Sequence, residues 1–147
     1  MKGVYWRTMD IIVLIGRILF VFVFLTSGYA HFAQRNQMAP YAASKGVPMA
    51  MPATLAGGVL LVGGGLSVLL GIWPDLGSLM LFAFLLPTAI LMHGFWKETD
   101  ATAKLTEQVQ FSKDLGLAGA SLMLFAFFSF VGDDLGLTIT GPLFHLH

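Results

Sequence analysis

The sequence predicts an all-α membrane protein, an antiparallel bundle of four transmembrane helices. Of the 147 residues, 56% are hydrophobic and only 11% are charged, whereas soluble domains contain about 25% charged residues. The chain also contains four apolar segments that are long enough to cross a bilayer, which requires about 20 residues in a helix. A chain of this length forms one domain, so residues 1–147 are expected to make a single transmembrane unit.

The four helices are expected over residues 9–33, 52–73, 76–96 and 111–132, followed by a tail over residues 133–147. Because the bilayer core offers no water to the backbone, each spanning segment should be helical. The first segment follows two basic residues, Lys2 and Arg7, as a signal peptide would. Its apolar stretch is longer than a typical signal core, so we expect it to be retained as a helix.

Two connections are expected to contain short helices outside the spans. Between residues 34 and 52, Pro40 can begin such a helix and Gly46 can end it. Residues 97–112 form the most polar stretch of the chain and are expected to make a separate surface helix. The tail is too short to span, and its alternating apolar residues suit an extended segment on a partner or on the bilayer surface.

Glycine and proline indicate how the spans pack. Gly57, Gly64 and Gly71 recur every seven residues and therefore lie on one stripe of the second helix. Small residues let helix backbones approach closely in lipid, so this stripe predicts tight packing. A phosphate-binding loop is excluded because no strand precedes these glycines. Pro87 lacks an N–H and tends to kink a helix, which would tilt the end containing His93 toward the bundle axis.

Composition excludes several classes of function. The net charge is zero and there is no cysteine. Nothing therefore indicates nucleic-acid binding, and disulfides, thiol redox chemistry and cysteine-ligated clusters are excluded.

Ionisable residues inside or at the ends of the spans are the candidates for function. In an antiparallel bundle, the ends of the first and third helices share one membrane face with the start of the fourth, and we call this face the loop side. His31 and His93 end the first and third helices, and Lys113 and Asp114 begin the fourth. Ionisable groups in a membrane usually face the bundle interior and mark function. We therefore expect His93 to contact His31, Asp114 or both.

Such a cluster suits a quinone, whose carbonyls need donors and acceptors and whose tail needs an apolar slot. The candidate residues for this polar site are His31, His93, Lys113, Asp114, Trp96 and Tyr29. A histidine beside a carboxylate can exchange protons near neutral pH. The alternative is that these amphipathic side chains simply lie at the level of the lipid headgroups. No residue is assigned a catalytic role.

Haem and metal ions are weaker alternatives. Two histidines on facing helices can ligate haem iron axially, and His31 and His93 lie near the same membrane face. Two histidines alone are a weak pattern, so haem is disfavoured. A metal ion held by both histidines and Asp114 is similarly weak, and no cofactor is assigned.

Arg17 lies about two turns inside the first helix, on the opposite face, which we call the terminus side. It can extend toward the interface and pair with Asp10, Asp75 or Asp133, or it can turn inward. Extension and pairing is the default expectation. In either case we expect the protein, and not the lipid, to hold this charge.

Five segments resemble one known family. They are GRILFVFVFLTSGYAHF, YAASKGVPM, LLVGGGLSVLLGIW, PTAILMHGFW and VQFSKDLGLAGASLML. In this order and spacing, over about residues 16–125, the chain resembles the DoxX family of small four-helix membrane proteins. The positions that match those the family favours are Arg17, Ser27, Gly28, Gly46, Pro48, Gly64, Gly65, His93, Lys113 and Asp114. Leu61 stands where members often have glutamate, and Asp114 where they often have asparagine.

The resemblance implies a four-helix bundle, in a family associated with thiosulfate:quinone oxidoreductases, quinol oxidases and oxidative-stress complexes. We therefore expect an accessory or quinone-contacting subunit of a membrane redox or respiratory complex that is not catalytic on its own. One alternative is a quinone-linked oxidoreductase acting through His31, His93 and Asp114. Another is a purely structural partner. The expected location is a bacterial or archaeal inner membrane, with lipid and other membrane subunits as neighbours and the tail docking a partner.

Overall fold

The computed structural model describes residues 2–146, with side chains from residue 7 onward. The helices are α1 (Lys2–Ala33), α2 (Arg35–Ser44), α3 (Ala50–Leu70), α4 (Pro74–Met92), η1 (Phe95–Lys97), α5 (Ala101–Val131) and η2 (Gly132–Asp134). Four of them, α1, α3, α4 and α5, are long and apolar enough to cross a membrane. The expected all-α class with four membrane-length helices is confirmed.

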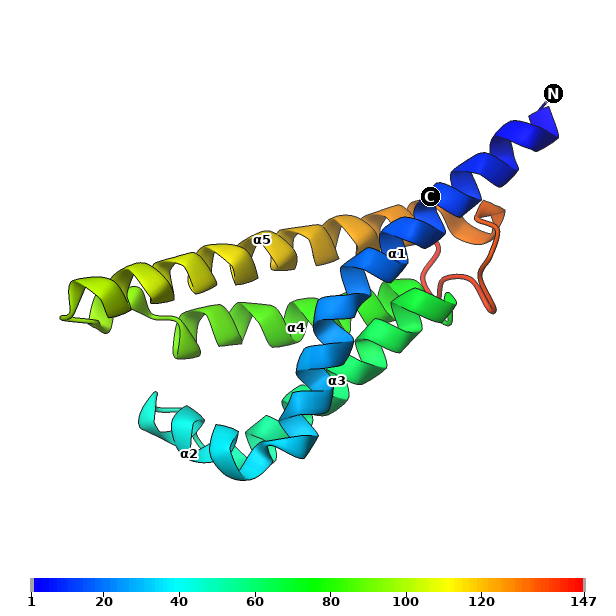
Figure 1. Ribbon diagram of the computed structural model, residues 1–147. Coiled ribbons are helices and arrows are strands. Elements are labelled where there is room, and N and C mark those ends of the chain that lie inside the picture. The colour runs from blue at the N-terminus through cyan, green and yellow to red at the C-terminus, as the bar shows by residue number, and fades with distance from the viewer. Residues whose placement is uncertain (1, 147) are drawn as a thin grey trace.

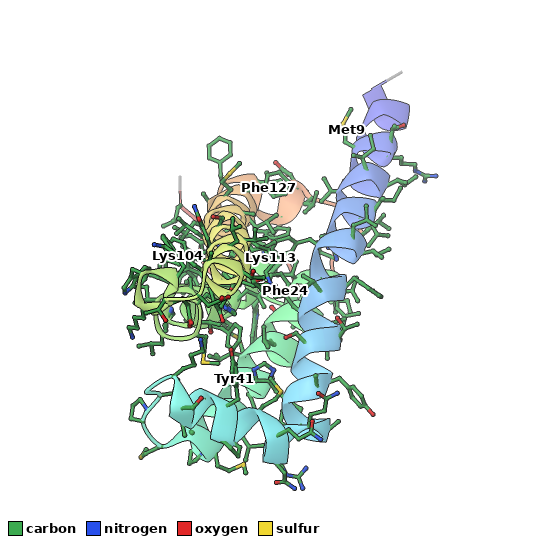
Figure 2. All side chains as sticks on the ribbon, turned by 60° about the vertical axis from the view of Figure 1, so that its left-hand side comes forward. Met9, Phe24, Tyr41, Lys104, Lys113 and Phe127 are labelled. Atoms are coloured by element: carbon green, nitrogen blue, oxygen red, sulfur yellow. The ribbon has the colours of Figure 1, made fainter. Side chains whose placement is uncertain are left out.

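The four long helices form an open bundle. α3 packs against both α1 and α4, and α4 packs along α5. Among the described residues, α1 and α5 form no extensive interface, and Figure 2 shows α1 standing apart from α5. The side of the bundle between α1 and α5, which we call the α1–α5 seam, is therefore not closed by direct helix packing.

Several helix ends differ from those expected: α1 already begins at Lys2, α3 ends at Leu70 and α4 ends at Met92. Pro40 lies inside α2, which begins at Arg35. α5 begins ten residues before position 111, because the Asp100 side chain accepts a hydrogen bond from the Ala103 N–H at 2.8 Å and caps the helix there. No glycine or proline follows until Gly116, so nothing interrupts the helix. The expected separate surface helix is the first part of α5.

The glycine stripe of α3 serves two purposes. A Cβ at Gly57 would lie 2.9 Å from the Phe84 ring, and one at Gly64 would lie 2.8 Å from the Gly77 carbonyl oxygen. Both glycines therefore let α4 approach α3 closely, as expected. Gly71 does not belong to this contact. It caps α3 with a φ of 65°, in the left-handed region, and faces the backbone of Thr138.

The C-terminal tail folds back onto the terminus side of its own chain. The Asp10 carboxylate accepts the Gly136 N–H at 3.0 Å. The buried Asp75 carboxylate accepts the N–H groups of Leu143 and Phe144, at 2.9 and 2.6 Å. The tail bends at several residues, including Leu137 with a φ of 58°, and its backbone is bound by the bundle itself.

Arg17 is held inside the protein. Its side chain is only 2% exposed, and it donates to the carbonyls of Val68 at 2.8 Å, Leu137 at 2.9 Å, and Leu69. The default expectation of pairing with an aspartate is wrong. The last carbonyls of a helix lack internal partners, and a cation at that end is favourable, so Arg17 caps α3 and binds the tail.

Candidate functional site

A cavity of about 550 Å³ lies in the loop-side half of the bundle, with walls from all five α-helices. Most of its lining is apolar, including Phe24, Leu61, Leu85 and Leu117. The polar side chains of the lining are Ser27, His31, Tyr41, Thr54, Thr88, His93, Lys113 and Asp114. An apolar chamber with a few polar groups is the usual form of a small-molecule site.

Four of the six residues that the sequence nominated line this cavity: His31, His93, Lys113 and Asp114. Tyr29 does not line it and is 73% exposed, because two residues along a helix turn the side chain by about 200° from His31. Trp96 packs edge-on against Phe95 and Phe111, with ring centroids 5.3 and 5.6 Å away. It stays half-exposed outside the cavity.

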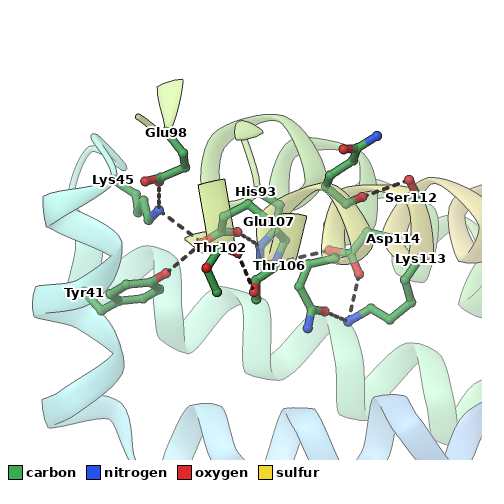
Figure 3. A network of polar contacts seen from close by, with 12 residues as sticks. Tyr41, Lys45, His93, Glu98, Thr102, Thr106, Glu107, Ser112, Lys113 and Asp114 are labelled. Atoms are coloured by element: carbon green, nitrogen blue, oxygen red, sulfur yellow. Dashed lines mark hydrogen bonds and ion pairs between the residues drawn. The ribbon is translucent and has the colours of Figure 1, made fainter. Parts of the chain in front are cut away.

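His93 lies between two carboxylates of α5. Its Nδ1 is 2.7 Å from Glu107 Oε2, and its Nε2 is 3.6 Å from Asp114 Oδ2 (Figure 3). A neutral imidazole has one N–H, whereas an imidazolium has two and can face both carboxylates. The Nδ1 contact is within hydrogen-bond distance, whereas the Nε2 contact is a longer ion-pair approach. The expected approach to Asp114 is present, but within the described chain His93 has no recorded polar contact with His31.

A chain of polar contacts extends from His93 toward the loop-side surface. Glu107 Oε1 accepts from Lys45 Nζ at 3.2 Å and from the Tyr41 hydroxyl at 3.4 Å. Lys45 Nζ also donates to Glu98 Oε1 at 2.9 Å. These carboxylates, Glu98 first, raise the pKa of Lys45. Lys45 follows α2 in the sequence, so this contact ties the α2 end of the molecule to the ends of α4 and α5.

Charge in this network is nearly balanced. Lys113 Nζ lies 3.4 Å from Asp114 Oδ1 and donates to Gln110 at 2.6 Å. Three carboxylates, those of Glu98, Glu107 and Asp114, thus accompany two lysines. A proton on His93 would neutralise the remaining negative charge.

His31 lines the cavity from α1 and is 9% exposed. Its Nδ1 lies 2.8 Å from the Ser27 carbonyl oxygen. Because a carbonyl only accepts, Nδ1 must hold the proton, and Nε2 of the neutral ring is an acceptor. Nε2 has no recorded hydrogen-bond partner in the part of the chain that the structure describes. The ring packs edge-on against Phe84 at 5.4 Å.

Sequence reasoning missed Glu107, Lys45 and Tyr41. A signal for Glu107 existed, because it lies seven residues before Asp114 and thus on the same inward stripe of α5. Placing residues 97–112 in a separate helix concealed that periodicity. Lys45 and Tyr41 had no comparable signal, since only the folding of α2 against the bundle brings them to Glu107.

The arrangement does not suit haem ligation by the two histidines. Both ring nitrogens of His93 face carboxylates, so an axial bond to iron would displace one of them. Among residues 2–146, no three histidine, aspartate or glutamate side chains are grouped to hold a metal ion.

Fold and site together define a small multi-pass membrane protein with an internal, partly polar cavity. The DoxX family model matches residues 12–94. The Inner membrane protein YphA of Escherichia coli strain K12 is 30% identical over 115 residues, which cover 78% of this chain and 81% of that protein. No solved structure matches the chain significantly.

The chain belongs to the DoxX family, and the sequence resemblance is confirmed. The family, the inner-membrane relative and the four apolar helices point to a multi-pass integral inner-membrane protein.

Proposed function

We propose that this protein is an accessory subunit of a membrane redox or respiratory complex and that its cavity binds the headgroup of a quinone. The observation that supports the proposal is an apolar cavity with polar groups in its lining. Nε2 of His31, on α1, is available to accept a hydrogen bond, and the His93–Asp114 pair lines the same cavity from the end of α4 and from α5. A quinone carbonyl needs a donor and a quinol hydroxyl needs an acceptor, and these groups supply both.

Two features favour binding over catalysis by this chain alone. Leu61, where members of the family often have glutamate, is 1% exposed and makes the middle of the cavity wall apolar. Arg17, which such a glutamate would pair with, is engaged by backbone carbonyls. Electrons for a quinone would therefore come from a partner subunit, while this chain would hold the headgroup and exchange its protons through His93.

Calorimetric titration of the purified protein in nanodiscs with decylubiquinone and with menadione tests this proposal. Wild-type protein should bind at least one of them. His31→Phe removes one hydrogen-bonding group and should weaken binding by roughly two- to tenfold, since a hydrogen bond contributes about 0.5–1.5 kcal/mol. His145→Phe is the matched control, because this histidine lies in the tail and is 44% exposed. Absence of binding, or equal affinity in His31→Phe, would contradict the proposal.

The same preparation separates the alternatives. Reduction of bound quinone by the isolated chain with a soluble donor would support an oxidoreductase acting through His31, His93 and Asp114. A stable membrane partner without any quinone binding would support a structural role.

A further inference from the structure

A second groove, of about 430 Å³, lies in the α1–α5 seam. Its lining comes from two helices, α1 and α5. The lining residues are Val13, Gly16, Arg17 and Phe20 of α1 and Ala120, Met123, Leu124 and Phe127 of α5. The guanidinium of Arg17 is engaged by three carbonyls, so the groove presents an almost wholly apolar surface.

The groove lies beyond the cavity along one face of α1. The α1 lining residues of groove and cavity recur mostly at spacings of three or four from Val13 to His31, which keeps them on one side of that helix. On α5 the groove residues follow the cavity residues along the helix but are turned around it, by about 180° between Asp114 and Met123. At 1.5 Å per residue, this face of α1 from Val13 to His31 is about 27 Å long, close to the roughly 30 Å thickness of a bilayer core.

The junction between the two spaces is formed by aromatic rings. Phe20 lines the groove and Phe24 lines the cavity, and their rings pack edge-on at 4.9 Å. One turn further from the cavity, a Cβ at Gly16 would meet nothing within 4 Å. The groove therefore begins directly beyond this ring pair, with free space beside Gly16.

We propose that the α1–α5 seam holds the polyprenyl tail of the molecule whose headgroup occupies the cavity. This inference rests on the proposed function and identifies the ligand class as a long-tailed quinone. The headgroup lies at the loop side among His31, His93 and Asp114, and the tail runs between α1 and α5 toward the terminus side. Lipid chains are as apolar as the polyprenyl tail, so the seam can distinguish the tail from lipid only by shape and contact. The experiment must therefore show where the tail lies in the protein.

Photo-cross-linking in nanodiscs tests the location. Three probes carry the same diazirine: a naphthoquinone on its polyprenyl tail, the matching polyprenol without the headgroup, and a phosphatidylcholine on an acyl chain. Mass spectrometry should find the quinone probe attached to Met123 and Phe127, and excess menadione should abolish that labelling. The polyprenol and the phospholipid should label these residues weakly and without competition.

A filling variant gives the second arm. Gly16→Phe occupies the groove and should remove the labelling of Met123 and Phe127 by the quinone probe. Gly119→Phe is the control, since a Cβ there also meets open space but the residue does not line the groove. Thermal unfolding checks that both variants are folded.

The outcomes separate this inference from the proposed function. Equal labelling by all three probes, or full labelling in Gly16→Phe while wild-type protein still binds menadione, would overturn the seam inference alone. Labelling between two copies of the chain across the seam would overturn it in favour of a dimer contact. Failure of every quinone to bind would remove both proposals.

Discussion

Replacing Arg17 by leucine should destabilise the protein strongly, even though leucine is the better residue for a membrane helix. Arg17 makes three hydrogen bonds, two to carbonyls at the end of α3 and one to Leu137 in the tail. Leucine would leave all three carbonyls without this donor. Two of them belong to the last turn of α3, where no further helical N–H can replace it.

The expected loss of folding stability follows from two opposing contributions to the free energy of unfolding. A hydrogen bond from a charged group contributes about 1.5–3 kcal/mol, so three of them contribute roughly 4–9 kcal/mol. Removing a charged side chain from the centre of a membrane helix recovers about 2.5–3.5 kcal/mol. Arg17→Leu should therefore lower the free energy of unfolding by about 0.5–6.5 kcal/mol. The stability of Arg17→Lys should lie between those of the wild type and Arg17→Leu, because a compact ammonium cannot reproduce the planar guanidinium fork.

Equilibrium unfolding in mixed micelles, followed by circular dichroism, measures this change, and limited proteolysis reports release of the tail. Arg35→Leu is the matched control: Arg35 is exposed and makes one bond, to the Phe32 carbonyl at 2.9 Å. Replacing the Arg35 side chain should change the free energy of unfolding by no more than about 0.5 kcal/mol. An Arg17→Leu protein as stable as the wild type, with a protected tail, would refute this reasoning.

Three further results are expected. A double-mutant cycle of His93→Ala and Glu107→Gln should give a coupling of about 1–2 kcal/mol, because the atoms lie 2.7 Å apart; simple additivity would mean that the pair contributes nothing jointly. Gly64→Ala should lower the melting temperature, because the new Cβ would lie 2.8 Å from a backbone oxygen. Gly119→Ala is its control: a Cβ there meets open space, so the change should be neutral or stabilising by up to about 1 kcal/mol. Truncation after Asp134 should also lower the melting temperature, and unchanged thermal unfolding would show that the tail does not stabilise the bundle.

The spans and their inward faces could be predicted from the sequence because both depend on local periodicity. Arg17, Phe24 and His31 are spaced by seven, and all three are buried on one face of α1. Helix ends were less predictable. Hydropathy marks where the chain leaves the bilayer, whereas a helix continues until a cap or a breaker stops it. The helix α5 therefore includes most of the polar stretch over residues 97–112 and begins only after its cap, Asp100.

The composition of the candidate site was only partly predictable, because periodicity gives a face and a depth but not a lateral distance. His93 and Asp114 come close because α4 and α5 pack together. His31 lines the same cavity from α1, which stands apart from α5. The separation of these helices, which creates both the cavity and the seam, is a property of three-dimensional packing that no single segment encodes.

One sequence signal, an ionisable residue in an apolar segment, has different physical meanings at the two ends of this bundle. On the terminus side, Arg17, Asp10 and Asp75 bind backbone carbonyls and N–H groups, which do not titrate and therefore fix one structure. On the loop side, His93 faces the carboxylates of Glu107 and Asp114, which are themselves ionisable groups. The chemical nature of the partner therefore distinguishes a structural charge from a candidate site, and that partner is visible only once the chain is folded.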